Sequence, residues 1–149
     1  MYEQLKLDNQ VCFRLYTASR LITQAYRPLL EPLGLTYPQY LVLMVLWEKD
    51  HQTVSEISKR LMLESNTLTP LMQRMEKEGL VVRKKGTADS RQTLVSLTRK
   101  GARLEEQAKD IPSCMALSLS GCSPSQQQAT AMAEALDQLI EILKKSTAK

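Results

Sequence analysis

Apolar residues recur at helical spacing near the start of the chain. Asp8 has the side chain of a helix N-cap, and a long helix is expected from there to Leu30. Pro28, Pro32 and Gly34 should break it. One face of this helix carries an apolar stripe, made of Val11, Leu15, Ala18, Ile22 and Ala25.

A second helix is expected after Thr36, which has capping-box spacing with Gln39. The ten residues 40–49, YLVLMVLWEK, are apolar almost all round. A helix without a polar face is typical of the centre of a fold, so this one should be buried.

Two short helices should follow. Thr53 and Glu56 form another capping box, and Ser65 is expected to cap a helix over 66–78 that ends at Gly79. Pro70 removes a backbone N–H inside that helix and predicts a slight kink. Its buried face should consist of Leu68, Leu71, Met72 and Met75.

The hydrophobic period then changes from helical to that of strands. Residues 80–82 and 93–97 read as two paired strands, and the residues 83–92 between them form a flexible tip around Gly86. After Thr98 the helical pattern returns and continues to the end of the chain, interrupted near Pro112. The expected fold is mostly helical, with a winged helix-turn-helix and a small β-hairpin as its wing.

Charge is concentrated in the same region. The whole chain carries a net charge of +4, but residues 74–103 hold nine Lys/Arg against three Asp/Glu. A basic patch on an otherwise nearly neutral chain indicates a polyanionic partner. A merely solvated charged surface is the alternative.

Composition excludes several other classes. At 149 residues the chain fits one domain. Its N-terminus lacks signal-peptide features, and the apolar run 41–47 is too short to span a bilayer, so a cytoplasmic protein without membrane contact is expected. With a single histidine, His51, and no Gly-rich phosphate loop, no metal, cofactor or hydrolytic triad is expected, and the chain should not be an enzyme.

The helix after Ser65 is the candidate DNA reader. Its N-terminal residues would lie at base edges in the major groove of double-stranded DNA. Hydroxyl, amide and guanidinium side chains suit this role because they form hydrogen bonds to bases and phosphates. The candidate residues are Ser65, Asn66, Thr67, Thr69, Gln73 and Arg74.

The wing offers a second contact. Arg91 on a flexible tip could enter the minor groove, and Asp89 could hold its guanidinium by a charge-assisted pair. Arg83, Lys84 and Lys85 would meet phosphates, which set affinity more than sequence preference.

These motifs resemble the MarR family of winged-helix repressors. The matching segments are the DSR tip (89–91), TLTPL (67–71), MEKEGLV (75–81) and VSLTRKG (95–101). The resemblance implies a repressor that binds a pseudo-palindromic operator as a homodimer. It also implies interleaved dimerisation helices over 1–35 and 99–149, around a winged-helix module over 36–98.

Cys12 is the candidate sensor. If Asp8 is the N-cap, Cys12 is the fourth helical residue, close to free backbone N–H groups and the positive end of the helix dipole. That environment favours a thiolate, which attacks peroxides and becomes a sulfenic acid. A buried apolar cysteine in a dimer core explains its position equally well.

The segments LDNQVCFRLYTASR (7–20) and YRPLLEPLGLTYPQYLVLMVLWE (26–48) resemble the organic-hydroperoxide sensors of the MarR family, the OhrR group. The resemblance makes Cys12 the peroxide-reacting residue. It makes Tyr26 and Tyr37 of the partner subunit hydrogen-bond donors to the sulfur, with Tyr16 lining the same pocket. Phe13 and Leu43 would then favour an alkyl or lipid hydroperoxide.

Two further cysteines, Cys114 and Cys122, bear on the next step. Some members of this group form a disulfide between subunits, while others use a small cellular thiol. We favour a disulfide, and prefer Cys122 over Cys114 because it follows Gly121 in an expected loop.

Three functions compete at this point. The leading hypothesis is a repressor that releases its operator when an organic hydroperoxide oxidises Cys12, and that controls a peroxide-detoxification gene. The alternative is a MarR-type repressor released by a phenolic or aromatic ligand, in which Cys12 is structural. A stand-alone thiol peroxidase is disfavoured, because it would leave the basic winged helix unexplained.

Overall fold

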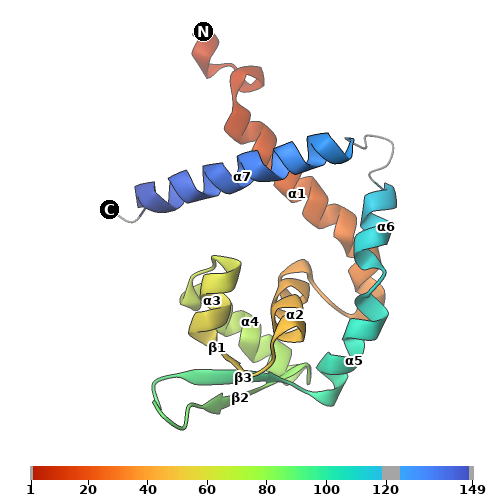
Figure 1. The fold of residues 1–149 in the computed structure, drawn as a ribbon, viewed down its shortest axis with the longest axis vertical. Helices are drawn as coiled ribbons and strands as arrows, with labels where there is room; N and C mark the ends of the chain where they lie inside the picture. The colour runs from red at the N-terminus through yellow and green to blue at the C-terminus, as the bar shows by residue number, and fades with distance from the viewer. Residues whose placement is uncertain (1, 119–124, 148–149) are drawn as a thin grey trace. The chain divides into compact units, whose positions relative to one another are not determined.

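The computed structural model describes residues 2–118 and 125–147, which belong to two compact units, Met1–Ile111 and Pro112–Lys149. The first unit contains five helices and a small sheet (Figure 1). Its helices are α1 (Val11–Leu30), α2 (Tyr37–Glu48), α3 (Val54–Leu61), α4 (Ser65–Lys77) and α5 (Arg99–Ala108), with short 3-10 turns at Glu3–Leu5, Leu7–Asn9 and Glu31–Leu33.

The start of α1 differs from the prediction. Asp8 lies in the 3-10 turn Leu7–Asn9, and Gln10 is the N-cap of α1. Cys12 is therefore the second helical residue and not the fourth. The helix also runs through Pro28 and ends at Leu30, so Pro28 does not break it. Cys12 still lies in the first turn, where backbone N–H groups have no helical partner.

The helix-turn-helix consists of α3 and α4. The predicted capping box at α3 is confirmed, since the Thr53 N–H donates to Glu56 Oε2 (2.7 Å) and the Glu56 N–H donates to Thr53 Oγ1 (3.1 Å). For α4 the prediction was one residue late, because Glu64 is the N-cap and Ser65 is the first helical residue. The helix is continuous across Pro70.

The core of this unit forms where α2, α3 and α4 meet the sheet. The predicted inner face of α4 is confirmed, because Leu68, Leu71, Met72 and Met75 are all buried. As expected for a helix apolar all round, α2 is central, and its buried residues are Gln39, Tyr40, Val42, Leu43, Val45 and Leu46.

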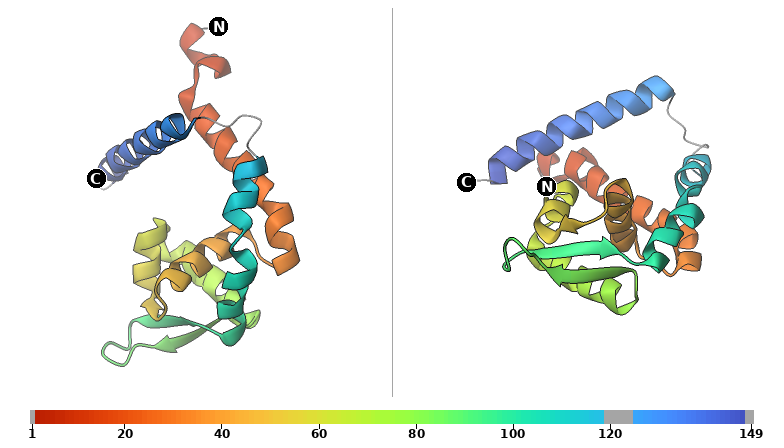
Figure 2. Two further views of the ribbon diagram at one scale, coloured as in Figure 1. Left: turned by 45° about the vertical axis from the view of Figure 1, so that its right-hand side comes forward. Right: turned by 60° about the horizontal axis from the view of Figure 1, so that its bottom comes forward.

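The sheet has three antiparallel strands in the order β1-β3-β2, where two were expected. The strands β2 (Val81–Lys85) and β3 (Thr93–Leu97) form the predicted hairpin, whose tip extends beyond the helices (Figure 2). The unexpected strand is β1 (Gln52–Thr53), which pairs with Val95 and Leu94 of β3. A two-residue strand is too short to show a hydrophobic period, so it could not be predicted from the pattern of apolar residues.

The second unit contains α6 (Ile111–Ser118) and α7 (Gln126–Thr147). The break near Pro112 is confirmed, because α5 ends at Ala108 and Pro112 lies in the first turn of α6. No residue of α7 is buried, and large apolar side chains are exposed along it: Met132, Leu136, Ile140, Ile142 and Leu143.

Within residues 2–118 and 125–147, no single helix is long and apolar enough to cross a membrane. One bent pair, Val11–Leu33 with Tyr37–Glu48, meets the criterion by length and composition only. Buried core helices meet the same criterion, and half of α2 is buried in the core.

Candidate DNA-binding surface and sensing site

The predicted base-reading residues form the outer face of α4. Ser65, Asn66, Thr67, Thr69, Gln73 and Arg74 are all exposed, while the opposite face packs into the core. The Thr69 hydroxyl donates to the Ser65 carbonyl (2.8 Å), which orients the side chain while leaving its oxygen able to accept. The helix therefore presents donors and acceptors on one continuous surface.

The wing tip holds Arg91 as predicted. Asp89 accepts hydrogen bonds from the Arg91 backbone N–H (3.0 Å), Nε (3.1 Å) and Nη2 (3.2 Å). The hydrogen bonds from Arg91 lower the pKa of Asp89 below its ordinary value, so the carboxylate stays charged. The Arg91 side chain is nevertheless 90% exposed and can reach a ligand.

A glycine closes the tip. The Gly86 N–H donates to the Gln92 carbonyl (2.8 Å), and the Gln92 N–H donates to the Asp89 carbonyl (3.1 Å). A Cβ at Gly86 would lie 2.6 Å from the Asp89 carbonyl oxygen, which no real side chain tolerates. The position therefore requires glycine to bring Asp89 and Arg91 into this turn.

Arg83 has a partner inside the protein, which the sequence did not suggest. Its Nε and Nη2 donate to Glu76 Oε2 (3.0 and 2.7 Å), and its backbone N–H donates to Glu76 Oε1 (3.1 Å). Arg83 was expected to meet a phosphate freely, as the exposed Lys84 and Lys85 still can. This charge-assisted pair instead ties the wing to the last turn of α4.

Four of the predicted DNA-binding residues line one hollow of about 280 Å³. They are Ser65 and Thr69 of α4 with Arg83 and Arg91 of the wing. The same hollow is also lined by Thr53, Val54 and Ser55 at the start of α3. Recognition helix and wing thus share one concave, basic surface.

Aromatic side chains form a second constellation on α1 and α2. The rings of Tyr26 and Tyr37 lie 4.8 Å apart, Tyr40 lies 6.0 Å from Tyr26, and Trp47 lies 6.2 Å from Tyr40. Burial, followed by the neighbouring Tyr26, raises the pKa of Tyr37, so its phenol stays protonated and can donate a hydrogen bond. The structure thus brings together the two predicted sensing tyrosines.

Tyr40 is a member that the sequence analysis missed. It is buried, and the Tyr37–Tyr40 spacing of three residues on a helix was the available signal. Leu43 was expected beside the reactive sulfur. It is wholly buried in the core of the first unit, so it does not line an exposed peroxide site. Phe13 is partly exposed and remains available.

Cys12 lies apart from these tyrosines within one chain. Cys12 and Tyr26 are separated by fourteen positions of the same continuous helix, or about 21 Å along its axis. Cys12 and Tyr16 are both exposed at the N-terminal end of α1, while Tyr26 and Tyr37 lie at the junction with α2. One copy of the chain therefore cannot bring the sulfur to this tyrosine pair.

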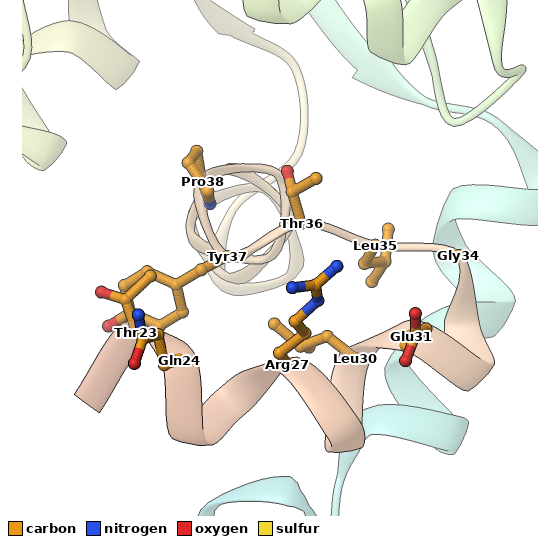
Figure 3. Close-up of a pocket in the computed structure, with 10 residues that line it drawn as sticks. All are labelled: Thr23, Gln24, Arg27, Leu30, Glu31, Gly34, Leu35, Thr36, Tyr37 and Pro38. Carbon is orange, nitrogen blue, oxygen red and sulfur yellow. The ribbon is translucent and has the colours of Figure 1, made fainter. Parts of the chain in front are cut away.

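A cavity of about 520 Å³ lies beside Tyr37 (Figure 3). It separates the C-terminal half of α1 from the start of α2, and its lining is mostly apolar. Arg27 and Tyr37 both line this space, together with the carboxylate of Glu31 and the apolar Leu30, Leu35 and Pro38. Such a lining suits a small ligand with an apolar body and a polar end.

Of the two candidate resolving thiols, Cys114 is exposed on α6, and Cys122 lies outside the described residues. Within residues 2–118 and 125–147, no group of three His, Cys, Asp or Glu side chains could hold a metal ion.

Comparison with known proteins gives this geometry a context. The family described as transcriptional regulator SarA/Rot matches residues 24–108. The organic hydroperoxide resistance transcriptional regulator of Bacillus subtilis (strain 168) is 50% identical over 111 residues, which cover 74% of this chain and 76% of the relative. The chain belongs to the MarR family of winged-helix transcriptional regulators, in the group of organic hydroperoxide resistance regulators.

Solved structures of this family agree with the fold. The structure of reduced AbfR bound to DNA is 38% identical with a TM-score of 0.76, and covers 95% of this chain and 97% of that chain. The structure of disulfide-formed AbfR is 37% identical with a TM-score of 0.60, over 99% and 96%. The fold class and the family are thus confirmed, and these MarR-family relatives are regulators of transcription, not enzymes.

We predict that Arg91→Ala weakens operator binding and makes it less sensitive to salt. Loss of one cation that displaces a counterion should reduce the slope of log K against log[salt] by about 0.9. Fluorescence anisotropy across a salt series measures both effects. Lys109→Ala, which removes one charge from the end of α5, should leave the slope unchanged. An unaltered slope in Arg91→Ala would remove the wing from the interface.

We predict that the Glu76–Arg83 pair stabilises the fold in a pH-dependent way. Hydrogen bonds from Arg83 lower the pKa of Glu76 below its ordinary value of 4.5. The stabilisation is therefore complete above pH 4.5 and is lost as the pH falls through the lowered value. Urea unfolding of wild type and Glu76→Gln should differ at neutral pH and converge in acid. Glu105→Gln on exposed α5 is the control, and a gap that persists in acid contradicts the assignment.

Proposed function

We propose that this protein is a dimeric repressor that an organic hydroperoxide releases from its operator by oxidising Cys12. The relatives support the class of signal, since one is named as an organic hydroperoxide resistance regulator and AbfR has been solved in reduced, overoxidised and disulfide forms. The exposed face of α4 and the Asp89–Arg91 wing supply the DNA-binding surface.

The separation of Cys12 from the tyrosine pair is the observation that carries this proposal. A sulfur about 21 Å from Tyr26 along one helix can meet the pair only if it comes from a second copy. The sensing site is then composite, with Cys12 and Tyr16 from one subunit and Tyr26 and Tyr37 from the other. Dimerisation becomes part of sensing and not only of operator geometry.

Exposed apolar surface supports dimerisation independently. Leu30 is the only buried residue of α1, while Val11, Leu21 and Ile22 are exposed in the single chain. Helix α7 likewise buries none of its residues. Large apolar surfaces of this kind mark interaction sites. We assign 1–35 and 99–149 to the dimer interface and 36–98 to the DNA-binding module, and a two-fold dimer then requires a pseudo-palindromic operator.

The chemistry follows from the position of Cys12. A thiolate in the first turn of α1 attacks the terminal peroxide oxygen, so that an S–O bond forms and the O–O bond breaks. The alkoxide takes up a proton and leaves as an alcohol, and Cys12 becomes a sulfenic acid. The protonated phenol of the partner's Tyr37 can donate to the sulfenate oxygen. A second thiol then attacks this sulfur, and water leaves as the disulfide forms.

The cavity beside Tyr37 favours one other function. Leu30, Leu35 and Pro38 offer apolar contact, and Arg27 and Tyr37 offer polar contacts beside Glu31, which would fit a phenolic or aromatic acid. Cys12 would then have only a structural role. A ligand of this kind would release the operator without any oxidant, so the two functions are separable by experiment.

We predict that Cys12→Ser binds the operator like wild type but is not released by cumene hydroperoxide. The serine hydroxyl fills the same space and does not react with peroxides. Gel shift or anisotropy with and without the oxidant measures the difference. Release of Cys12→Ser by the oxidant would refute the thiol switch. Release of wild type by an aromatic acid alone would favour the ligand-gated function.

We predict that oxidised wild type contains a disulfide between subunits that joins Cys12 to Cys122. A non-reducing gel should show a band of doubled mass, which Cys122→Ser loses and Cys114→Ser keeps. The opposite pattern would assign the resolving role to Cys114. A wild type without the doubled band, but with a small thiol attached to Cys12 by mass spectrometry, would contradict the two-cysteine interpretation.

A further inference from the structure

A buried amide connects the start of α2 to the end of the recognition helix. Gln39 is only 4% exposed, and both ends of its side chain are bound. Its Oε1 accepts the Thr36 backbone N–H (2.9 Å), and its Nε2 donates to Glu78 Oε2 (2.7 Å). One planar group therefore joins two segments that are far apart in sequence.

The two ends of this link lie beside the proposed sensing site and at the end of the recognition helix. Thr36 and Gln39 flank Tyr37, whose ring contacts Tyr26 at 4.8 Å. Glu78 is the C-cap of α4. The link thus runs from the backbone that carries a tyrosine of the proposed sensing site to the base of the helix that reads DNA.

The last turn of α4 passes this connection on to the wing. Glu76, two residues before Glu78, holds the Arg83 side chain and backbone N–H of β2. The same end of α4 is held from α5, since Lys100 Nζ donates to the Glu78 carbonyl (2.9 Å) and Thr98 Oγ1 donates to the Gly79 carbonyl (2.6 Å). A displacement of Glu78 would therefore be shared by recognition helix and wing.

We propose that Gln39 is the positioning residue that couples Tyr37 to the recognition helix. This inference rests on the proposed function, in which oxidation of the partner's Cys12 acts on the tyrosine pair. Glu78 is exposed, but the Gln39 amide is buried, and a buried amide left unpaired is costly. When the segment around Tyr37 moves, the amide and Glu78 move with it.

Substitutions at positions 39 and 78 allow a test with four proteins: the wild type, two single variants and the double variant. In Gln39→Glu the new carboxylate still accepts the Thr36 N–H, so the N-terminal cap of α2 is kept. The same carboxylate faces that of Glu78, and without a donor the hydrogen bond between positions 39 and 78 is lost. In Glu78→Gln the Gln39 amide still finds an acceptor. In the double variant Gln39→Glu/Glu78→Gln the hydrogen bond is restored with its direction reversed. The four proteins are compared from about pH 7 to pH 9, because a proton shared by the two facing carboxyls would preserve the link and is lost as the pH rises.

The readout is the ratio of operator affinities of the reduced and the fully oxidised protein, with oxidation of Cys12 verified by mass. Gln39→Glu should lower this ratio by about threefold or more. Glu78→Gln should stay within about twofold of wild type, and the double variant should recover. A purely structural role would lower the melting temperature without changing the ratio.

An unchanged ratio in Gln39→Glu, or no recovery in the double variant, overturns the inference. If Gln39→Glu does not fold, Glu78→Ala is measured in its place. Alanine removes the carboxylate that accepts from Gln39 and leaves the hydrogen bond between Gln39 and the Thr36 N–H intact. It should also lower the ratio, and an unchanged ratio there overturns the inference as well. Failure of the proposed function is distinct, because wild type itself would then show no Cys12-dependent change in affinity.

Discussion

The C-terminal end of α4 must satisfy its free carbonyl groups, and the rest of the DNA-binding module depends on how it does so. Gly79 takes a φ of +72°, a left-handed conformation that suits glycine, and this lets the Leu80 N–H return to the Met75 carbonyl (2.9 Å). Thr98 and Lys100 bind the Gly79 and Glu78 carbonyls from the next helix. The chain approaches so closely that a Cβ on Gly101 would lie 2.2 Å from the Leu80 carbonyl oxygen. Recognition helix, wing and α5 therefore meet at one closely packed, hydrogen-bonded junction.

The proposed sensing cysteine lies at the other end of the same unit. The N-terminal turn of α1 carries Cys12, whereas the tyrosine pair lies where α1 meets α2. Because a helix fixes that separation, the proposed redox chemistry requires two copies of the chain. A row of contacting aromatic rings runs from Tyr26 through Tyr40 to Trp47. The Trp47 Nε1 donates to the Gly101 carbonyl (3.0 Å). Aromatic packing and the Gln39 amide thus both lead from the tyrosine pair toward the junction behind the recognition helix.

Much of this architecture could be predicted from local signals. The capping box of Thr53 and Glu56, the buried stripe of α4 and the Asp89–Arg91 pair all depend on residues close in sequence, and all are confirmed. The failures have physical causes. Asp8 has a side chain that can cap a helix, but it lies inside a 3-10 turn. Strand β1 is too short to show a hydrophobic period. The pairs Gln39–Glu78 and Arg83–Glu76 were missed because tertiary packing, and not spacing, brings these side chains together.

We propose that oxidation of Cys12 is the event that releases DNA. The most direct measurement titrates a reduced protein–operator complex with substoichiometric cumene hydroperoxide, and follows operator release by anisotropy and Cys12 oxidation by peptide mass in the same samples. We expect the released fraction to rise with the oxidised fraction of Cys12, and both to saturate together. Release that precedes Cys12 oxidation, or complete oxidation with the operator still bound, would contradict it.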